Sequence, residues 1–103
     1  MSAEFKLLLD EALGAVVHVR FKTARRAVVD YSVVLLVEVG GEFKTVRLYD
    51  GAHGKNELHR YTADGIKQPA EVFHRGNLGE GMRAAKRDIN NGYRVMIESW
   101  QKQ

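Results

Sequence analysis

The sequence predicts a single α+β domain, residues 1–103, with an antiparallel β-meander of about four strands and helices packed on the sheet. Three patterns predict this fold. Apolar and polar residues alternate over residues 17–22, a β-rich run spans residues 31–39, and apolar side chains recur every three or four positions over residues 78–100. The chain has no internal repeat and no linker that would divide it.

A short amphipathic helix is expected near the N-terminus, over residues 2–13. Phe5 and Leu8 belong to an apolar set at helical spacing, Ser2 is placed to cap the helix, and Gly14 is placed to end it. The alternating strand over residues 17–22 would then follow.

A β-hairpin is expected around Gly40-Gly41, because two glycines supply the positive φ angles of a two-residue turn. This register pairs Leu35 with Val46 and Val33 with Leu48 on one face. It pairs Val34 with Arg47 and Ser32 with Tyr49 on the other. The first strand is apolar on both faces, which predicts a central strand covered on both sides.

The C-terminal part predicts one or two further strands and an amphipathic helix. A strand is expected within the segment NELHRYTADG, residues 56–65, ended by a turn at Asp64-Gly65, and a short strand within residues 71–75 is an open alternative. Asn77 is placed to cap the helix, which packs across the sheet. The segment Asn90-Asn91-Gly92 would kink this helix or split it.

Composition excludes several classes of protein. The absence of cysteine excludes disulfides and zinc–thiolate sites. No apolar run reaches the roughly 18 residues that a membrane span needs, and the N-terminal stretch lacks the features of a signal peptide, so we expect a cytoplasmic protein without membrane contact. No phosphate-binding P-loop or dinucleotide fingerprint is present, and no cofactor is expected. The net charge of +3 permits a nucleic-acid partner without demanding one.

The candidate site is the segment "YDGAHGKNELHRY", residues 49–61. Histidine exchanges protons near neutral pH, so His53 and His59 are the candidate acid and base. Tyr61 would position or stack a substrate group. The candidate substrate-binding residues are Arg47, Arg60, Tyr49 and Arg87. Together they predict metal-independent cleavage of RNA, with His59, Tyr61, Arg47 and Tyr49 in one pocket.

Other interpretations of this segment remain open. Histidine and tyrosine on a strand are often solvated surface residues, and the glycines and Asn56 are typical of turns. Asp50, His53 and His59 are also of the types that bind zinc, manganese or iron, which makes a small metal-binding domain a further alternative. A non-catalytic module that binds nucleic acid or a protein is the third.

A basic strip is the second candidate surface. Its helical part shares one helix face, and its other part precedes the hairpin. The residues are Arg83, Lys86, Arg87 and Arg94, joined to Arg20, Lys22, Arg25 and Arg26. Such a strip would suit phosphates or an acidic partner, although a basic helix face is most often simply solvated.

Two segments resemble a known family: the loop "YDGAHGKNELHRY" and the amphipathic helix that ends near Trp100. Within the loop the likeness rests on Asp50, His53 and the run His59-Arg60-Tyr61. These segments resemble the small TumE-like proteins, the toxin components of bacterial toxin–antitoxin pairs, over roughly residues 28–100. A closely similar group of uncharacterised small bacterial proteins shares the pattern.

The resemblance implies growth arrest through RNA and a cognate antitoxin as the protein partner. Members of the family carry histidines more densely in this loop. Asn56 and Glu57 stand where such histidines would be expected.

Overall fold

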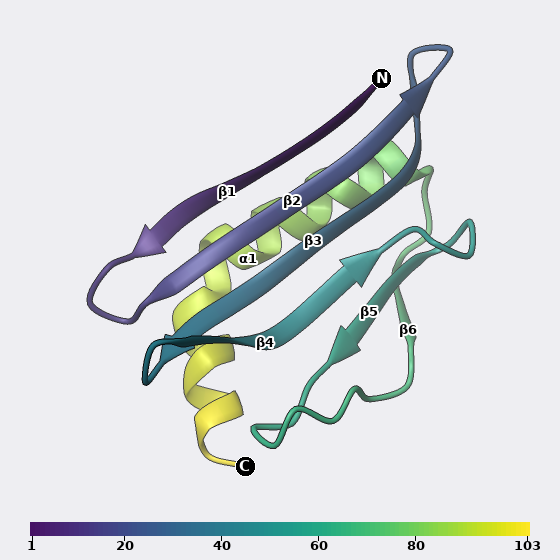
Figure 1. Cartoon of the computed structure of the whole chain (residues 1–103). Coiled ribbons are helices and arrows are strands. Elements are labelled where there is room, and N and C mark those ends of the chain that lie inside the picture. Colours follow the sequence, from purple (N-terminus) through teal and green to yellow (C-terminus); the bar gives the residue numbers. More distant parts are fainter.

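The chain forms one six-stranded antiparallel sheet with a long helix against one face (Figure 1). The computed structural model describes residues 1–103. Neighbouring strands in the sheet are also consecutive in the sequence, as in a meander. The elements are β1 Ser2–Asp10, β2 Ala15–Ala24, β3 Ala27–Val39, β4 Glu42–Asp50, β5 Asn56–Arg60, β6 Glu71–His74 and α1 Leu78–Gln101. The α+β class and the C-terminal helix are therefore confirmed, but the expected four or so strands are too few.

The expected N-terminal helix is wrong, because residues 2–10 form the strand β1. Phe5, Leu7 and Leu9 fit the period of a strand, while Phe5, Leu8 and Leu9 fit that of a helix, so the run satisfies both patterns. Antiparallel pairing with β2 supplies the backbone hydrogen bonds and decides between them, since Phe5 pairs with Val19. Tertiary pairing here overrides local spacing.

The β3–β4 hairpin confirms the two-residue turn but corrects the expected register. Val39 pairs with Glu42, and the pairing then shifts by one residue between Leu36 and Leu35. The shifted pairs are Val33 with Tyr49, Val34 with Leu48 and Leu35 with Arg47, in place of the four expected pairs. A bulge of this kind adds one residue to one strand, and a slip of one residue moves every later side chain to the other face.

The core lies between α1 and the facing side of the sheet. On β3 the buried side chains are Tyr31, Val33, Leu35 and Val37. Val46 of β4 points into the same core, and the bulge turns Tyr49 into it as well; they are 2% and 1% exposed. The apolar stripe of α1 meets them, as predicted, through residues that include Met82, Ile89 and Trp100.

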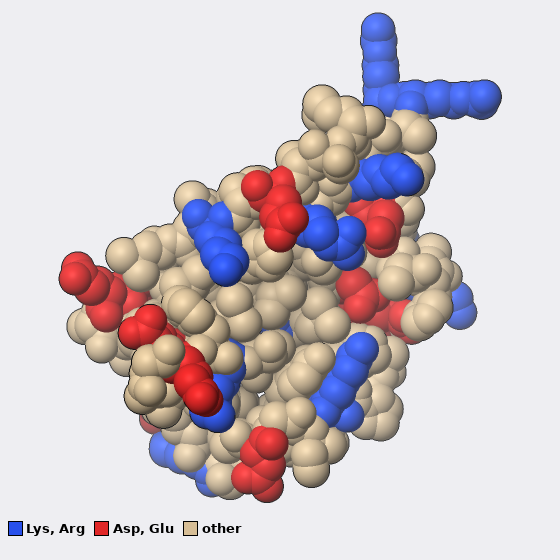
Figure 2. Space-filling model, viewed as in Figure 1, with Lys and Arg blue, Asp and Glu red and all other residues tan.

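The opposite face of the sheet, called the open face below, has no covering layer (Figure 1). Ser32, Val34 and Leu36 of β3 point to it and are half-buried. The expectation that both faces of this strand are covered is therefore wrong. Seen from this side, acidic and basic side chains are interspersed, and no patch of a single charge dominates (Figure 2).

The helix α1 begins and ends cleanly and is not interrupted. The Asn77 side chain accepts a hydrogen bond of 2.8 Å from the backbone N–H of Glu80, which confirms the predicted N-cap. The helix continues through Asn90-Asn91-Gly92, so this segment neither splits nor ends it. It is not apolar enough along its length to cross a membrane.

Candidate functional site

Strands β4 and β5 place three potential ligands together on the open face. Asp50 pairs with Glu57, and Leu48 pairs with His59 on the same side of the ladder. One ligand atom from each of Asp50, Glu57 and His59 lies within 4.8 Å of the other two. All three side chains belong to half-buried residues, so the cluster is partly shielded and still open to solvent. We call these three residues the β4–β5 cluster.

The loop after β4 brings His53 to the carboxylate of Glu57. The loop turns through Gly54 at φ 75°, and the Asp50 carboxylate accepts a hydrogen bond of 3.2 Å from the backbone N–H of Ala52. The Nδ1 atom of His53 then lies 2.9 Å from a carboxylate oxygen of Glu57. This contact, with help from the nearby His59, holds the pKa of Glu57 below its usual value.

The orientation of His59 is set by a backbone carbonyl. Its Nδ1 atom lies 3.0 Å from the carbonyl oxygen of Gln68. A carbonyl oxygen only accepts hydrogen bonds, so Nδ1 carries the hydrogen and donates it. In the neutral ring the lone pair is then on Nε2, which is free to bind a cation or to take a proton. Histidine ligands of metals are commonly held by a backbone carbonyl in this way.

Three predicted substrate-binding residues lie on the other side of the sheet. Arg47 pairs with Arg60, and Tyr49 pairs with the buried Leu58, so their side chains point toward the layer of α1. Tyr49 is 1% exposed, and burial raises its pKa. The expected pocket of His59, Tyr61, Arg47 and Tyr49 therefore does not form. Its premise was the β3–β4 register that the bulge changes.

The last two candidates are also separate from the cluster. Tyr61 forms an isolated bridge with Lys67 after β5 and lines a hollow whose wall includes Trp100. Arg87 is exposed on the outer side of α1. The predicted basic strip is divided as well, because Arg20 and Lys22 of β2 point to the open face. Of the seven predicted site residues, the structure brings together His53 and His59.

Glu57 belongs to the cluster although it is not among the candidate residues that the sequence indicates. It contacts His53 and lies beside Asp50 and His59. Its signal in the sequence is weak, since Asp50 and Glu57 are seven positions apart. Only the β4–β5 register shows that they are cross-strand partners.

A buried amide fixes the start of β5 beneath this cluster. Asn56 is 1% exposed and accepts a hydrogen bond of 2.8 Å from the Tyr31 hydroxyl. Its amide nitrogen donates to the backbone carbonyls of His74, Gly76 and Asn77 at 3.0–3.3 Å. Strand β5 is thereby tied to β3, β6 and the N-terminus of α1, which places Glu57 and His59 reproducibly.

Comparison with known proteins gives a family and no function. A family described as a domain of unknown function, DUF7718, matches residues 1–103. The chain belongs to the DUF7718 family. No curated protein and no solved structure matches the sequence. For this DUF7718 protein the chemistry of the β4–β5 cluster therefore has to be inferred from its own geometry.

Proposed function

We propose that this DUF7718 protein binds a divalent transition-metal ion at Asp50, Glu57 and His59, with His53 as a further ligand. The observation that carries the proposal is the mutual approach of the three ligand atoms within 4.8 Å. Closing that spacing on a metal needs side-chain adjustments of about an ångström, because metal–ligand bonds are about 2.0–2.2 Å long.

The charge of the cluster favours a cation. Two carboxylates lie side by side, and the one ion pair that either of them makes is between Glu57 and His53. No lysine or arginine is within ion-pair distance of Asp50 or Glu57. Adjacent carboxylates repel each other and any incoming phosphate, whereas a divalent cation relieves that repulsion.

The ligand types narrow the choice of metal. Imidazole together with carboxylate suits zinc, manganese and iron, whereas calcium and magnesium prefer all-oxygen sites. The carbonyl of Gln68 holds His59 Nδ1 and leaves Nε2 as the free ligand atom, as a metal site requires. The positions of these side chains therefore support metal binding better than they support the other functions considered for this loop.

Metal binding is tested by calorimetric titration of the purified, chelator-treated protein with Zn²⁺ and Mn²⁺. Wild type should bind one ion per chain, and His59→Ala and Asp50→Asn should each weaken binding by at least about tenfold. The matched control is His18→Ala, which removes an open-face histidine whose partner is Glu4, 2.7 Å away. Equal affinity in His59→Ala and His18→Ala, or no binding by wild type, would contradict the proposal.

A metal-independent ribonuclease is the second candidate. The observation in its favour is that the two predicted catalytic histidines both lie near the Glu57 carboxylate. The chemistry needs one histidine as base and one as acid, with His59 Nε2 free to take a proton. It ranks second because Arg47 and Arg60 lie on the opposite face, which leaves the phosphate without its predicted holders.

The two candidates give opposite responses to a chelator. RNA cleavage that continues in excess EDTA and disappears in His59→Ala would favour the ribonuclease, typically with a loss of about 10²–10⁴-fold. A TumE-like toxin role would further require that expression arrests growth and that a cognate antitoxin relieves the arrest. If RNA is held by the helix, Arg87→Glu should weaken its binding and flatten the dependence on salt.

A further inference from the structure

Strand β1 is an exposed apolar edge of the sheet. It pairs with β2 alone, and its other edge carries unpaired backbone N–H and C=O groups. Phe5, Leu7 and Leu8 are 38%, 54% and 64% exposed. Proteins usually protect such an edge with proline, extra charges or a covering segment, and β1 carries Glu4, Lys6 and Asp10 but no proline and no covering segment. An exposed, regular, apolar edge strand of this kind is a template for pairing with another strand.

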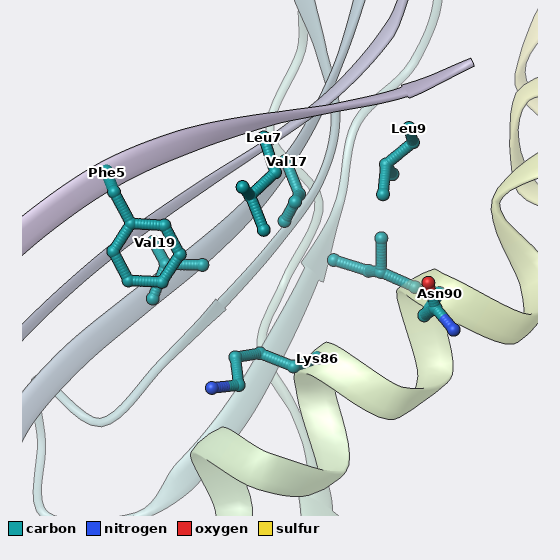
Figure 3. A pocket seen from close by; sticks show the side chains of 8 residues that line it. Phe5, Leu7, Leu9, Val17, Val19, Lys86 and Asn90 are labelled. Atoms are coloured by element: carbon teal, nitrogen blue, oxygen red, sulfur yellow. The ribbon is translucent and has the colours of Figure 1, made fainter.

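An apolar groove lies beside this edge, between β1, β2 and α1. Figure 3 shows Phe5, Leu7 and Leu9 of β1 above α1, with Lys86 and Asn90 on the helix side. The groove is also lined by Val17, Val19 and Ile89, so six of its eight lining residues are hydrophobic. It exists because α1 packs mainly on β3 and leaves the β1 end of the sheet without a covering element.

We propose that a second copy of this chain occupies the edge, with the two β1 strands paired antiparallel about a two-fold axis perpendicular to the sheet. The two six-stranded sheets then continue into each other. Such an axis preserves the faces of the sheet, so both α1 helices lie on the same side. The two apolar grooves adjoin across the axis, and the exposed Phe5 and Leu7, which point to the groove side, are covered.

The charges on β1 select one register. Pairing Phe5 with Phe5 of the second copy puts Glu4 opposite Lys6 of that copy, and Lys6 opposite its Glu4. If the partner of each residue moves by two positions, Lys6 lies opposite Lys6 of the second copy. If it moves by four positions, Glu4 lies opposite Asp10. Opposite charges across a strand pair stabilise it, and like charges destabilise it. Of these three registers, only the Phe5-centred one places opposite charges of the two β1 strands together.

The regularity of β1 favours the same register. The pairing of β1 with β2 is continuous from Ser2 to Leu8 and becomes irregular between Leu8 and Asp10. The Phe5-centred pairing uses residues 2–8, which is the regular part of the strand. It also sets Ala3 against Leu7 of the second copy on the groove side, so the small side chain leaves room for the large one.

Charge exchange tests the register and the partner together. Wild type should form a dimer by sedimentation equilibrium over a series from roughly millimolar to nanomolar protein. Glu4→Lys and Lys6→Glu should each be monomeric at concentrations where wild type dimerises. A mixture of the two variants should regain a dimer, because each strand then presents the charges that the other lacks. The control is Lys67→Glu, an exposed residue just before β6 at the opposite edge of the sheet, which should leave the dimer intact.

A cross-link provides a second measurement that does not depend on the charge variants folding equally well. The chain has no cysteine, so Phe5→Cys introduces a single thiol at the proposed axis. Directly opposed residues in an antiparallel pair have Cα atoms about 4.5–5.5 Å apart, which suits a disulfide. Val95→Cys is the control, since Val95 is 71% exposed on α1. Rapid oxidative dimerisation at position 5 alone supports the proposal. A monomeric wild type, an equally fast reaction at position 95, or no regain of dimer in the mixture overturns it.

Discussion

At the scale of single residues, Asn56 is the point where the fold depends most on polar contacts. It is the one polar or charged side chain fully buried in the structure, and its amide contacts four groups on β3, β6 and the start of α1. Gly81 of α1 lies directly against it, and a Cβ at Gly81 would overlap the Asn56 amide. A buried amide tolerates no such displacement, because its partners would lose their hydrogen bonds.

Replacing two glycines of α1 by alanine should therefore change the free energy of unfolding in opposite directions. Glycine inside a helix costs up to about 1 kcal/mol relative to alanine. Gly79→Ala should stabilise the protein by up to that amount, since its Cβ would meet only ordinary contacts at 3.5 Å or more. Gly81→Ala should instead destabilise it by about 1–3 kcal/mol through the loss of the Asn56 network. Urea unfolding of both variants measures the difference, and stabilisation by Gly81→Ala would contradict the role given to Asn56.

Glu57 should make stability depend on acid pH. Folding lowers its pKa from 4.5, chiefly through the hydrogen bond with His53. A lowered pKa means that the carboxylate stabilises the fold above the unfolded value and loses that effect as pH falls through the folded value. Wild type should thus lose more stability than Glu57→Gln as the pH falls below 4.5. Urea midpoints measured at several pH values test this. Parallel pH profiles for the two proteins would show that the His53 contact has no influence in solution.

Among the elements, the two hairpin turns on either side of β3 differ in backbone strain. Gly40 and Gly41 adopt φ of 60° and 84°, which glycine reaches without strain. Arg25 and Arg26 adopt φ of 52° and 67° in the β2–β3 turn, where side chains rarely sit. Basic side chains extend from this end of the molecule (Figure 2). The β2–β3 turn therefore carries backbone strain that its counterpart avoids.

Replacing the arginine pair by the preferred turn residues should stabilise the protein. We expect the double variant Arg25→Asn, Arg26→Gly to gain about 1 kcal/mol, because asparagine and glycine accept positive φ more readily. Thermal and urea unfolding against wild type measure the gain. The exchange Gly40→Asn, with Gly41 kept, is the control and should change little. A loss of stability in the double variant would show that the arginines make compensating contacts.

At the scale of the whole molecule, α1 packs along the sheet, and both of its ends are tied to β5 or to the segment next to it. Its first turn contacts β5 and β6 through the Asn56 network, and its last turn carries Trp100, which is 6% exposed. The indole N–H of Trp100 donates a hydrogen bond of 3.1 Å to the carbonyl of Thr62, beyond β5. One helix thus holds a sheet that has no second layer.

Shortening Trp100 should weaken the whole fold. Trp100→Ala should cost about 3–5 kcal/mol, as large-to-small changes of a buried aromatic do. Trp100→Phe should cost less, since it keeps an aromatic ring and loses the hydrogen bond to Thr62. Circular dichroism follows both variants, because Trp100 is the only tryptophan and fluorescence is lost with it. Equal costs for the two variants would show that the hydrogen bond, and not the packing of the ring, holds this end of the helix.

Local chemistry explains the parts of the fold that the sequence predicts well. The Gly40-Gly41 turn, the Asn77 cap and the apolar stripe of α1 depend on residues close together in the chain, and each is confirmed. The helix expected over residues 2–13 is wrong because the leucine run of β1 fits both periods, and pairing with β2 decides which applies. Both candidate histidines lie near Glu57, while their joint action stays a prediction.

The sequence predicts the α+β class, the β-hairpin, the C-terminal helix and the segment in which the titratable groups gather. Which of those groups share a face depends on how the strands pair in three dimensions. A bulge near Val46 shifts the register of β4, which sends Tyr49 into the core and leaves Asp50 beside Glu57 on the open face. The physical reason is the two-residue period of a strand: a shift of one residue reverses every later side chain, and the pairing of β4 with β3 sets that shift.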